Sequence, residues 1–271
     1  MPTYRFIIEY DGTDWHGWQS QPDCVTVQDA IEEALKTVLR TSVAIVGSGR
    51  TDSGVHARGQ VAHMRTDKPI DAERLQNSLN GILPGSVVIK TLDAVDDGFH
   101  ARYDARLRSY AYYVTVRPSA LFRRYQWHIR RTPDFSRMNE AARALIGRHD
   151  FSAFCKTASG TTNRECHVTQ ANWLPGSPWP IGSSVDRDES SGSWVFFIKA
   201  DRFLHGMVRT IVGTLVEVGH GKRSPESFVG LLNSLDRQQA GFAAPAHGLV
   251  LEHVEYLRGE DLRDRGPEET G

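Results

Sequence analysis

A single carboxylate stands in a glycine-rich segment, Gly47 to His56, with apolar runs on either side. The segment reads GSGRTDSGVH, and its only acid is Asp52. Glycines give the backbone conformations that are closed to other residues, so a ligand can approach it closely. A lone carboxylate presented in this way is typical of a nucleophile rather than of one half of an acid–base pair. An Asp that only caps a turn is the alternative, because Asp is common in turns.

Two better-known glycine-rich loops do not fit this segment. A dinucleotide-binding fingerprint requires a glycine where Asp52 stands and a helix after the loop. The residues that follow, 60–64, instead alternate as a strand. A phosphate-binding P-loop requires Lys and then Ser or Thr after Gly54, where this chain has Val and His. The segment is therefore predicted to be a loop between two strands, the first of them over 43–46.

The elements around the loop follow the order strand, helix, strand, strand, helix, strand. Thr26 and Asp71 are the predicted N-caps of the two helices, because each precedes a periodic apolar stretch. This order is the ferredoxin-like split βαβ pattern, and the second half of the chain runs similarly. We expect two α+β halves, each of which builds part of a sheet with helices on one side.

The chain is divided into two domains and a tail. Residues 1–105 carry the glycine-rich loop, residues 106–257 form the second domain, and residues 258–271 are polar and expected to be disordered. A strongly apolar helix is expected over 203–218. The range 175–193 is rich in Ser, Gly and Pro and is expected to be a surface loop.

Composition excludes several classes of protein. No apolar run reaches the roughly eighteen residues that a membrane-spanning helix needs. Three cysteines without Cys-x-x-Cys spacing argue against a disulfide framework and against a zinc site. The first residues lead directly into an alternating strand and do not resemble a signal peptide. We therefore expect a cytoplasmic protein.

The net charge of −1 hides a strongly basic segment. Between Arg102 and Arg131 there are 8 arginines and one acid, Asp104, with tyrosines and a tryptophan interleaved. Arginine mixed with aromatic residues is what phosphate contact and base stacking need. The segment predicts a nucleic-acid contact, and a solvated face of ordinary strand arginines is the alternative.

Several motifs together resemble those of the tRNA pseudouridine synthase A (TruA) family. They appear in the family's order from about residue 4 to residue 256, and Arg-Thr-Asp-x-Gly-Val-His is the most specific of them. The matching segments are Tyr10 to Thr13, Gly17 to Gln19, Gly49 to Ala57, Phe99 to Arg102, Tyr110 to Tyr112, His149 to Phe151, Phe203 to Gly213 and Gly248 to Leu251.

The resemblance implies a fold and an activity. The fold would be α+β, with two ferredoxin-like halves that share one mixed, mostly antiparallel sheet. The activity would be the isomerisation of uridine to pseudouridine at positions 38, 39 and 40, in the anticodon arm of tRNA. Such an enzyme needs no cofactor and no metal, and it acts as a homodimer that cradles the tRNA.

The resemblance also assigns roles to residues. Asp52 is the expected nucleophile, and Arg209 is expected to pair with it, which favours the ionised carboxylate and fixes its rotamer. Tyr110 is expected to stack on the target base after the base leaves the helix stack. Arg50, two residues before Asp52, is expected to contact phosphate or to help extrude the base. Whether the carboxylate attacks C1′ or C6 stays open.

Three alternatives remain beside this assignment. The same reaction at other tRNA uridines is the nearest of them. A non-catalytic tRNA-binding protein would keep the basic segment but lose the chemistry. A metal-dependent phosphodiesterase would need Asp11, Asp14 and Asp52 to converge on Mg²⁺.

Overall fold

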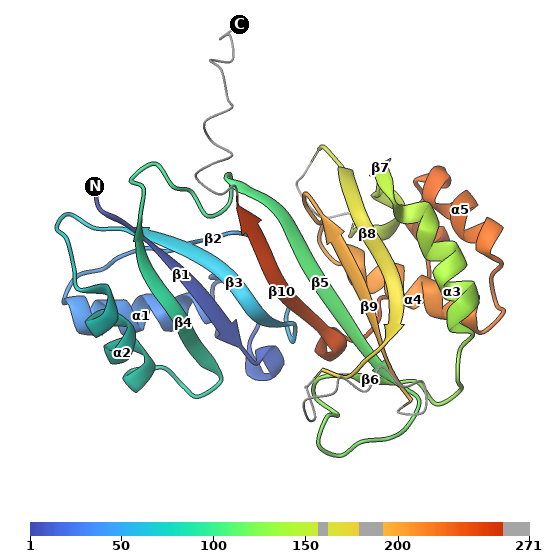
Figure 1. Ribbon diagram of the computed structural model, residues 1–271, viewed down its shortest axis with the longest axis horizontal. Coiled ribbons are helices and arrows are strands. Elements are labelled where there is room, and N and C mark those ends of the chain that lie inside the picture. The colour runs from blue at the N-terminus through green and yellow to red at the C-terminus, as the bar shows by residue number, and fades with distance from the viewer. Residues whose placement is uncertain (157–161, 179–191, 257–271) are drawn as a thin grey trace, which may run out of the picture.

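A ten-stranded sheet organises the protein (Figure 1). The computed structural model describes residues 1–156, 162–178 and 192–256, so the expected tail 258–271 and most of the expected loop 175–193 lie outside the described residues. The strands are β1 (Thr3–Tyr10), β2 (Val46–Gly47), β3 (His56–Arg65), β4 (Val87–Val95), β5 (Ala105–Thr115), β6 (Trp127–His128), β7 (Gly147–Asp150), β8 (Glu165–Pro175), β9 (Ser193–Ala200) and β10 (Leu249–Tyr256). The α-helices are α1 (Val27–Leu39), α2 (Ala72–Ile82), α3 (Phe135–Ala142), α4 (Met207–Gly219) and α5 (Pro225–Ser234).

The strand order shows two ferredoxin-like units in one sheet. The order is β4-β1-β3-β10-β5-β9-β8-β7, with β2 paired to β3 and β6 paired to β5. In the first half β4, β1, β3 and β2 follow one another, and in the second half β10, β5, β9 and β8 do the same. The β3–β10 and β5–β6 pairs are parallel and the other pairs are antiparallel. The expected mixed, mostly antiparallel α+β fold is confirmed.

The two halves join at β3. Its first residues pair with β10, where Val250 lies opposite His56, and its later residues pair with β2, where Gly47 lies opposite Ala62. The loop that connects β2 to β3 therefore ends at the strand pair that joins the halves. This loop carries Asp52.

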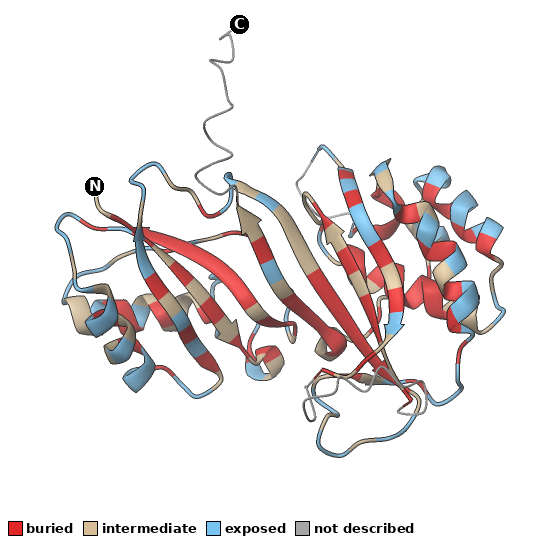
Figure 2. Ribbon diagram, in the orientation of Figure 1, coloured by how far each residue is buried: buried red, intermediate tan, exposed pale blue. Residues whose placement is uncertain are grey.

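Helices cover one face of the sheet at both of its ends. Helices α1 and α2 lie at one end, and α3, α4 and α5 lie at the other (Figure 1). Successive residues of β5 point to opposite faces. Tyr110 and Tyr112 belong to the large core that the helices share, whereas Ala111 and Tyr113 pack in a small separate cluster. Buried positions are concentrated in the central strands and on the inner sides of the helices (Figure 2).

Helix starts agree with the predicted caps in the first half. Thr26 accepts a hydrogen bond from the Asp29 N–H, and Asp71 accepts one from the Arg74 N–H. The strand expected over 43–46 is wrong in extent, because only Val46–Gly47 pairs. None of the helices in the described part of the chain is long and apolar enough to cross a membrane.

The helix expected from residue 203 begins only at Met207. Gly206 takes a φ of +73°, a left-handed conformation that glycine adopts without strain. The chain turns at this glycine, so Phe203 and His205 lie in the loop that precedes α4. Apolar residues stand on both sides of this turn, so the apolar pattern by itself could not indicate where the helix starts.

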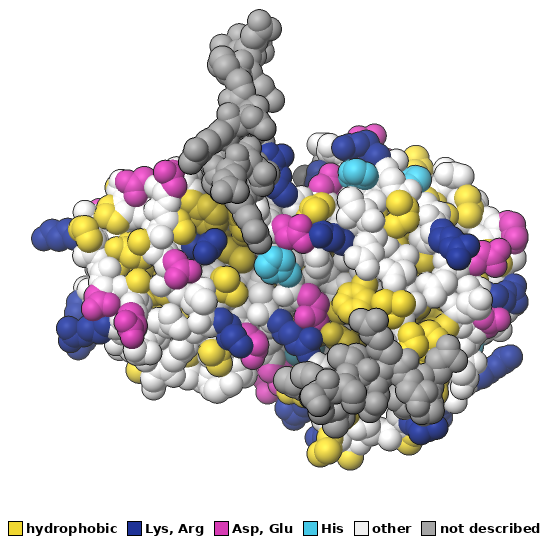
Figure 3. Space-filling view, viewed as in Figure 1, with side chains coloured by type: hydrophobic (Ala, Val, Ile, Leu, Met, Phe, Trp, Pro, Cys, Tyr) yellow, Lys and Arg dark blue, Asp and Glu magenta, His cyan; other side chains and the backbone are white. Residues whose placement is uncertain are grey.

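The basic segment does not form one continuous stripe. Arg102 and Arg106 lie at the start of β5, and the arginines from Arg117 onward follow its end, so a strand of 11 residues, about 35 Å, separates them. Arg108 is half-buried and donates to the backbone carbonyls of Ser48 and Asp201, which is a structural role. On the face seen in Figure 3, basic side chains are interspersed with acidic ones.

Candidate active site

The loop around Asp52 is anchored on both sides of the carboxylate. Thr51 is buried, and its hydroxyl lies 2.8 Å from the hydroxyl of Tyr10. The backbone N–H of Trp18 donates to the Thr51 carbonyl at 3.3 Å. A Cβ atom on Gly17 would stand 2.5 Å from that same carbonyl oxygen, so only glycine allows the approach. Asp52 itself keeps 19% of its side chain exposed, and a substrate can therefore reach it.

Arg209 pairs with Asp52 as predicted from the resemblance. Its Nη1 donates to Asp52 Oδ2 at 3.1 Å, and its Nε donates to the Ala244 carbonyl at 2.8 Å. Arg209 lies in the first turn of α4, so the helix and the carbonyl together fix the guanidinium. Charge-assisted hydrogen bonds of this kind hold a carboxylate in one orientation.

His205 completes the surroundings of the carboxylate, and the sequence analysis did not single it out. Its Nε2 lies 3.3 Å from Asp52 Oδ1, the oxygen that Arg209 leaves free, and 49% of its side chain is exposed. The left-handed turn at Gly206 places His205 outside α4 and over the loop. A signal was present in the sequence, because His205 lies within the same motif as Arg209.

Tyr110 faces the same site from β5. Its ring is buried and makes an edge contact with Phe203, with the centroids 5.0 Å apart. Burial raises the pKa of the Tyr110 hydroxyl above its usual value, and the nearby Tyr10 and Asp52 raise it further. The neighbouring Tyr112 is fully buried and donates its hydroxyl to the Pro245 carbonyl. Tyr113 belongs to the separate cluster and donates to Glu252, so Tyr110 is the tyrosine of β5 that we expect to contact a ligand at this site.

Arg50 lies on the same loop but faces solvent. Its Nε donates to Gln19 Oε1 at 3.2 Å, and the side chain is exposed. This position suits contact with a large substrate above the loop rather than with the reacting atoms.

His56 ties the base of the loop to three other segments. Its Nε2 lies 2.9 Å from the Arg124 carbonyl and 3.1 Å from the His247 carbonyl. Carbonyl oxygens only accept hydrogen bonds, so this nitrogen carries the hydrogen. Its Nδ1 faces the Gly12 N–H at 3.0 Å and Asp11 Oδ1 at 3.1 Å. The ring is 3% exposed and acts as a buried cross-link.

The carboxylates do not converge on a metal site. Within residues 1–156, 162–178 and 192–256, no group of three or more His, Cys, Asp or Glu side chains is placed to hold a metal ion. Asp11 instead accepts from the Thr13 N–H and hydroxyl, and Asp14 is exposed. The ligand set that the phosphodiesterase alternative requires is not formed by these side chains.

The fold and the site define an α+β enzyme with one cation-paired aspartate where two ferredoxin-like halves join. A family model described as tRNA pseudouridine synthase matches residues 6–104 and 141–257. The chain therefore belongs to the tRNA pseudouridine synthase family. It is an isomerase that converts uridine to pseudouridine in tRNA.

Curated relatives match over nearly the whole chain. The tRNA pseudouridine synthase A of Brevibacillus brevis is 45% identical over 258 residues, which cover 94% of this chain and 100% of that protein. The protein of the same name from Porphyromonas gingivalis is 42% identical over 259 residues, 94% of this chain and 98% of that one. The protein of the same name from Bacteroides thetaiotaomicron is 40% identical over 256 residues, which cover 94% of this chain and 91% of that protein.

Proposed function

We propose that this enzyme isomerises uridines 38, 39 and 40 in the anticodon arm of tRNA, with Asp52 as its nucleophile. The observation that carries the proposal is the 3.1 Å pair between Asp52 and Arg209 beside the buried ring of Tyr110. One carboxylate, one fixed cation and one aromatic face are the groups that the reaction needs. The relatives' name, tRNA pseudouridine synthase A, supports the choice of substrate.

The proposed chemistry rearranges one molecule without an external reactant. The ionised carboxylate attacks the nucleoside, the bond between C1′ and N1 breaks, and the detached uracil turns within the site. A bond then forms between C1′ and C5, the bond between the carboxylate and the nucleoside breaks, the proton on C5 is lost, and N1 takes up a proton. Atoms and electrons balance without a cofactor, because uridine and pseudouridine are isomers. Attack at C1′ and attack at C6 both fit this scheme.

Each side chain has a proposed part in this scheme. Arg209 holds the carboxylate at its Oδ2 and leaves the Oδ1 edge toward His205 for the attack. Tyr110 stacks on the extruded base, and such stacking is worth roughly 1–3 kcal/mol per base. Arg50 contacts the RNA backbone from the solvent side of the loop. We also retain as proposals the homodimer, the cytoplasmic location and the division into domains 1–105 and 106–257.

The test is a metal-free assay on an unmodified tRNA transcript that carries tritium at uracil C5. Wild type and Asp52→Asn are compared for release of label, and the pseudouridines are then mapped. We expect release by wild type, no release by Asp52→Asn with tRNA binding retained, and marks at 38 to 40. Near-normal release by Asp52→Asn would contradict the nucleophile, and marks elsewhere would contradict only the target positions.

A further inference from the structure

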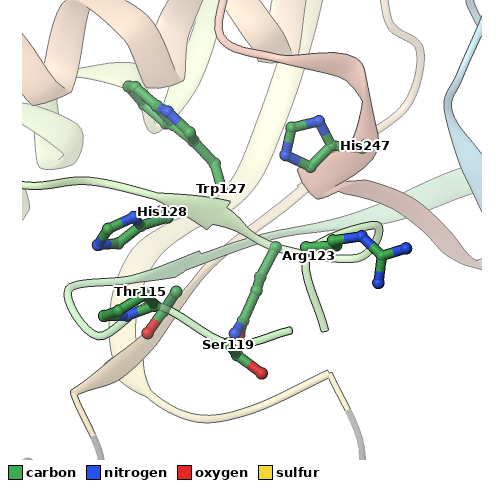
Figure 4. Close-up of a pocket in the computed structure, with 8 residues that line it drawn as sticks. Thr115, Ser119, Arg123, Trp127, His128 and His247 are labelled. Carbon is green, nitrogen blue, oxygen red and sulfur yellow. The ribbon is translucent and has the colours of Figure 1, made fainter. Parts of the chain in front are cut away.

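A pocket outside the candidate active site lies in the half of the protein that carries β5 and β6 (Figure 4). Its volume of about 380 Å³ is in the range of small-molecule sites, ~300–1,000 Å³. Trp127 and His128 lie on one side of it and His247 on the opposite side (Figure 4). The residues that line it are Thr115, Pro118, Ser119, Arg123, Gln126, Trp127, His128 and His247.

The pocket shares a wall with the candidate active site. The carbonyl of His247 accepts from His56, at the base of the Asp52 loop. The methyl group of Ala246 stands 3.2 Å from where a Cβ atom on Gly54 would lie. Burial lowers the pKa of the His247 ring, and the nearby charges of His56 and Arg209 lower it further. The segment 246–247 thus lies between the pocket and the loop that carries the carboxylate, and it contacts both.

The lining of the pocket has the chemistry of a nucleotide site. None of its 8 residues is acidic, and Arg123 supplies a cation that a backbone carbonyl, that of Ala120, holds in place. Trp127 supplies an aromatic surface. Unpaired RNA bases are recognised in this way, by aromatic side chains and arginine together with hydrogen bonds to the base edge.

Gln126 adds an unsatisfied polar group to this site. The residue is 4% exposed, and its Oε1 has no hydrogen-bond partner among the described residues. Buried polar atoms without a partner are rare, and each calls for a physical explanation. A ligand that draws the amide of Gln126 toward the pocket would supply the missing donor.

We propose that this pocket binds an unpaired nucleotide of the tRNA substrate other than the uridine that reacts at Asp52. The base lies against Trp127 and Gln126, and the phosphate lies at Arg123. The exposed Arg124 follows Arg123 in the chain, and its carbonyl accepts from His56 at the base of the Asp52 loop, so the pocket and the carboxylate can contact one RNA molecule. The proposal rests on tRNA being the substrate, and it adds a second point at which the enzyme reads the RNA.

The test measures binding rather than turnover, so it is separate from the test of the reaction. The ligands are anticodon stem-loop RNAs that carry cytidine at the target positions, which prevents turnover. One RNA is intact, and each of the others has a single abasic nucleotide at a different position of the loop. The variants are Arg123→Gln, which removes the cation, and Ser119→Met, which fills the pocket. Arg130→Gln, an exposed arginine that does not line the pocket, is the matched control. Thermal melting confirms that each variant is folded.

Apart from the target position, whose base is proposed to stack on Tyr110, we expect one abasic position to weaken binding by wild type about tenfold, the loss of one stacked base. Arg123→Gln and Ser119→Met should bind the intact RNA about tenfold more weakly than wild type does. Their affinity for the RNA that is abasic at this sensitive position should be little lower than their affinity for the intact RNA. Such non-additivity indicates direct contact between the changed groups. Arg130→Gln should keep the wild-type pattern.

The proposal would be overturned if, in both pocket variants and at every loop position, the loss of affinity from the substitution and the loss from the abasic nucleotide simply added. Wild-type affinity of both variants for the intact RNA would also overturn it. If the coupling appears but wild type releases no tritium from any tRNA, the proposed reaction fails and the nucleotide pocket stands.

Discussion

Asp52 and Arg209 are 157 positions apart in the chain, yet their side chains meet at 3.1 Å. One comes from the loop before β3 and the other from the first turn of α4, so each half of the protein supplies one member of the pair. The pair exists only when β3 and β10 are in register, because that parallel pairing joins the halves. The proposed catalytic pair therefore depends on the docking of the two halves.

Replacing Arg209 with Lys should lower kcat about 100-fold, with little change in KM. Lysine keeps the positive charge, but it cannot bind Asp52 and the Ala244 carbonyl at once with a planar fork. A misplacement of about 1 Å at a reacting group costs about this much. The measurement is steady-state tritium release.

His205→Gln is the matched comparison for that variant. His205 contacts the other oxygen of Asp52, but it is half exposed and its contact is longer. Exposed ion pairs contribute little, so kcat should stay within about fivefold of wild type. Equal losses in His205→Gln and Arg209→Lys would contradict the view that Arg209 alone fixes the carboxylate.

Tyr110→Leu should weaken tRNA binding about tenfold, whereas Tyr110→Phe should bind like wild type. Phenylalanine keeps the ring that we propose to stack on the base, and leucine does not. The Kd is measured in the Asp52→Asn background, so that turnover and any role of the hydroxyl in catalysis do not enter. A Kd that rises equally in both variants would assign the binding to the hydroxyl instead.

His56→Ala should lower the free energy of unfolding by about 2–4 kcal/mol. The change removes a buried ring and leaves the Arg124 and His247 carbonyls without their shared donor. His56→Gln keeps an N–H group and should recover part of the loss. Urea denaturation measures both, and a loss below ~1 kcal/mol in His56→Ala would show that the ring is not a cross-link.

His63 should make stability depend on pH below neutrality. Burial, together with the charges of His100 and Arg65, lowers the pKa of His63 to about 4. Its unfolded-state pKa is about 6.5. The unfolded chain therefore binds the proton first, and stability is full above about pH 6.5 and falls as the pH drops toward 4. The expected loss is roughly 2–3 kcal/mol.

His63→Gln should flatten this pH dependence, because glutamine does not titrate and can still accept from the Ala101 N–H. His253→Gln, at an exposed position of β10, is the control and should keep the wild-type curve. Denaturation midpoints between pH 4 and pH 7 would reveal the difference, and parallel curves for all three proteins would rule His63 out.

Local signals predicted much of the fold. Short stretches of sequence encode the helix caps Thr26 and Asp71, the alternation within strands and the order of the elements. The structure confirms each of these. Apolar periodicity failed where a turn lies between apolar residues, as at Gly206 before α4. Local signals also failed for the basic segment, because sequence proximity does not show that Arg102 and Arg117 lie at opposite ends of β5.

The sequence by itself determined the elements, the glycine-rich loop and the single carboxylate, since periodicity, caps and residue chemistry are local properties. Only the tertiary structure decided which side chains surround that carboxylate. It brought His205 to one oxygen of Asp52 and left Tyr110 rather than Tyr112 facing the site. It also bound His56 to two distant carbonyls. These contacts depend on the register of β3 against β10, and a register between strands far apart in the chain is set by the packing of the whole sheet.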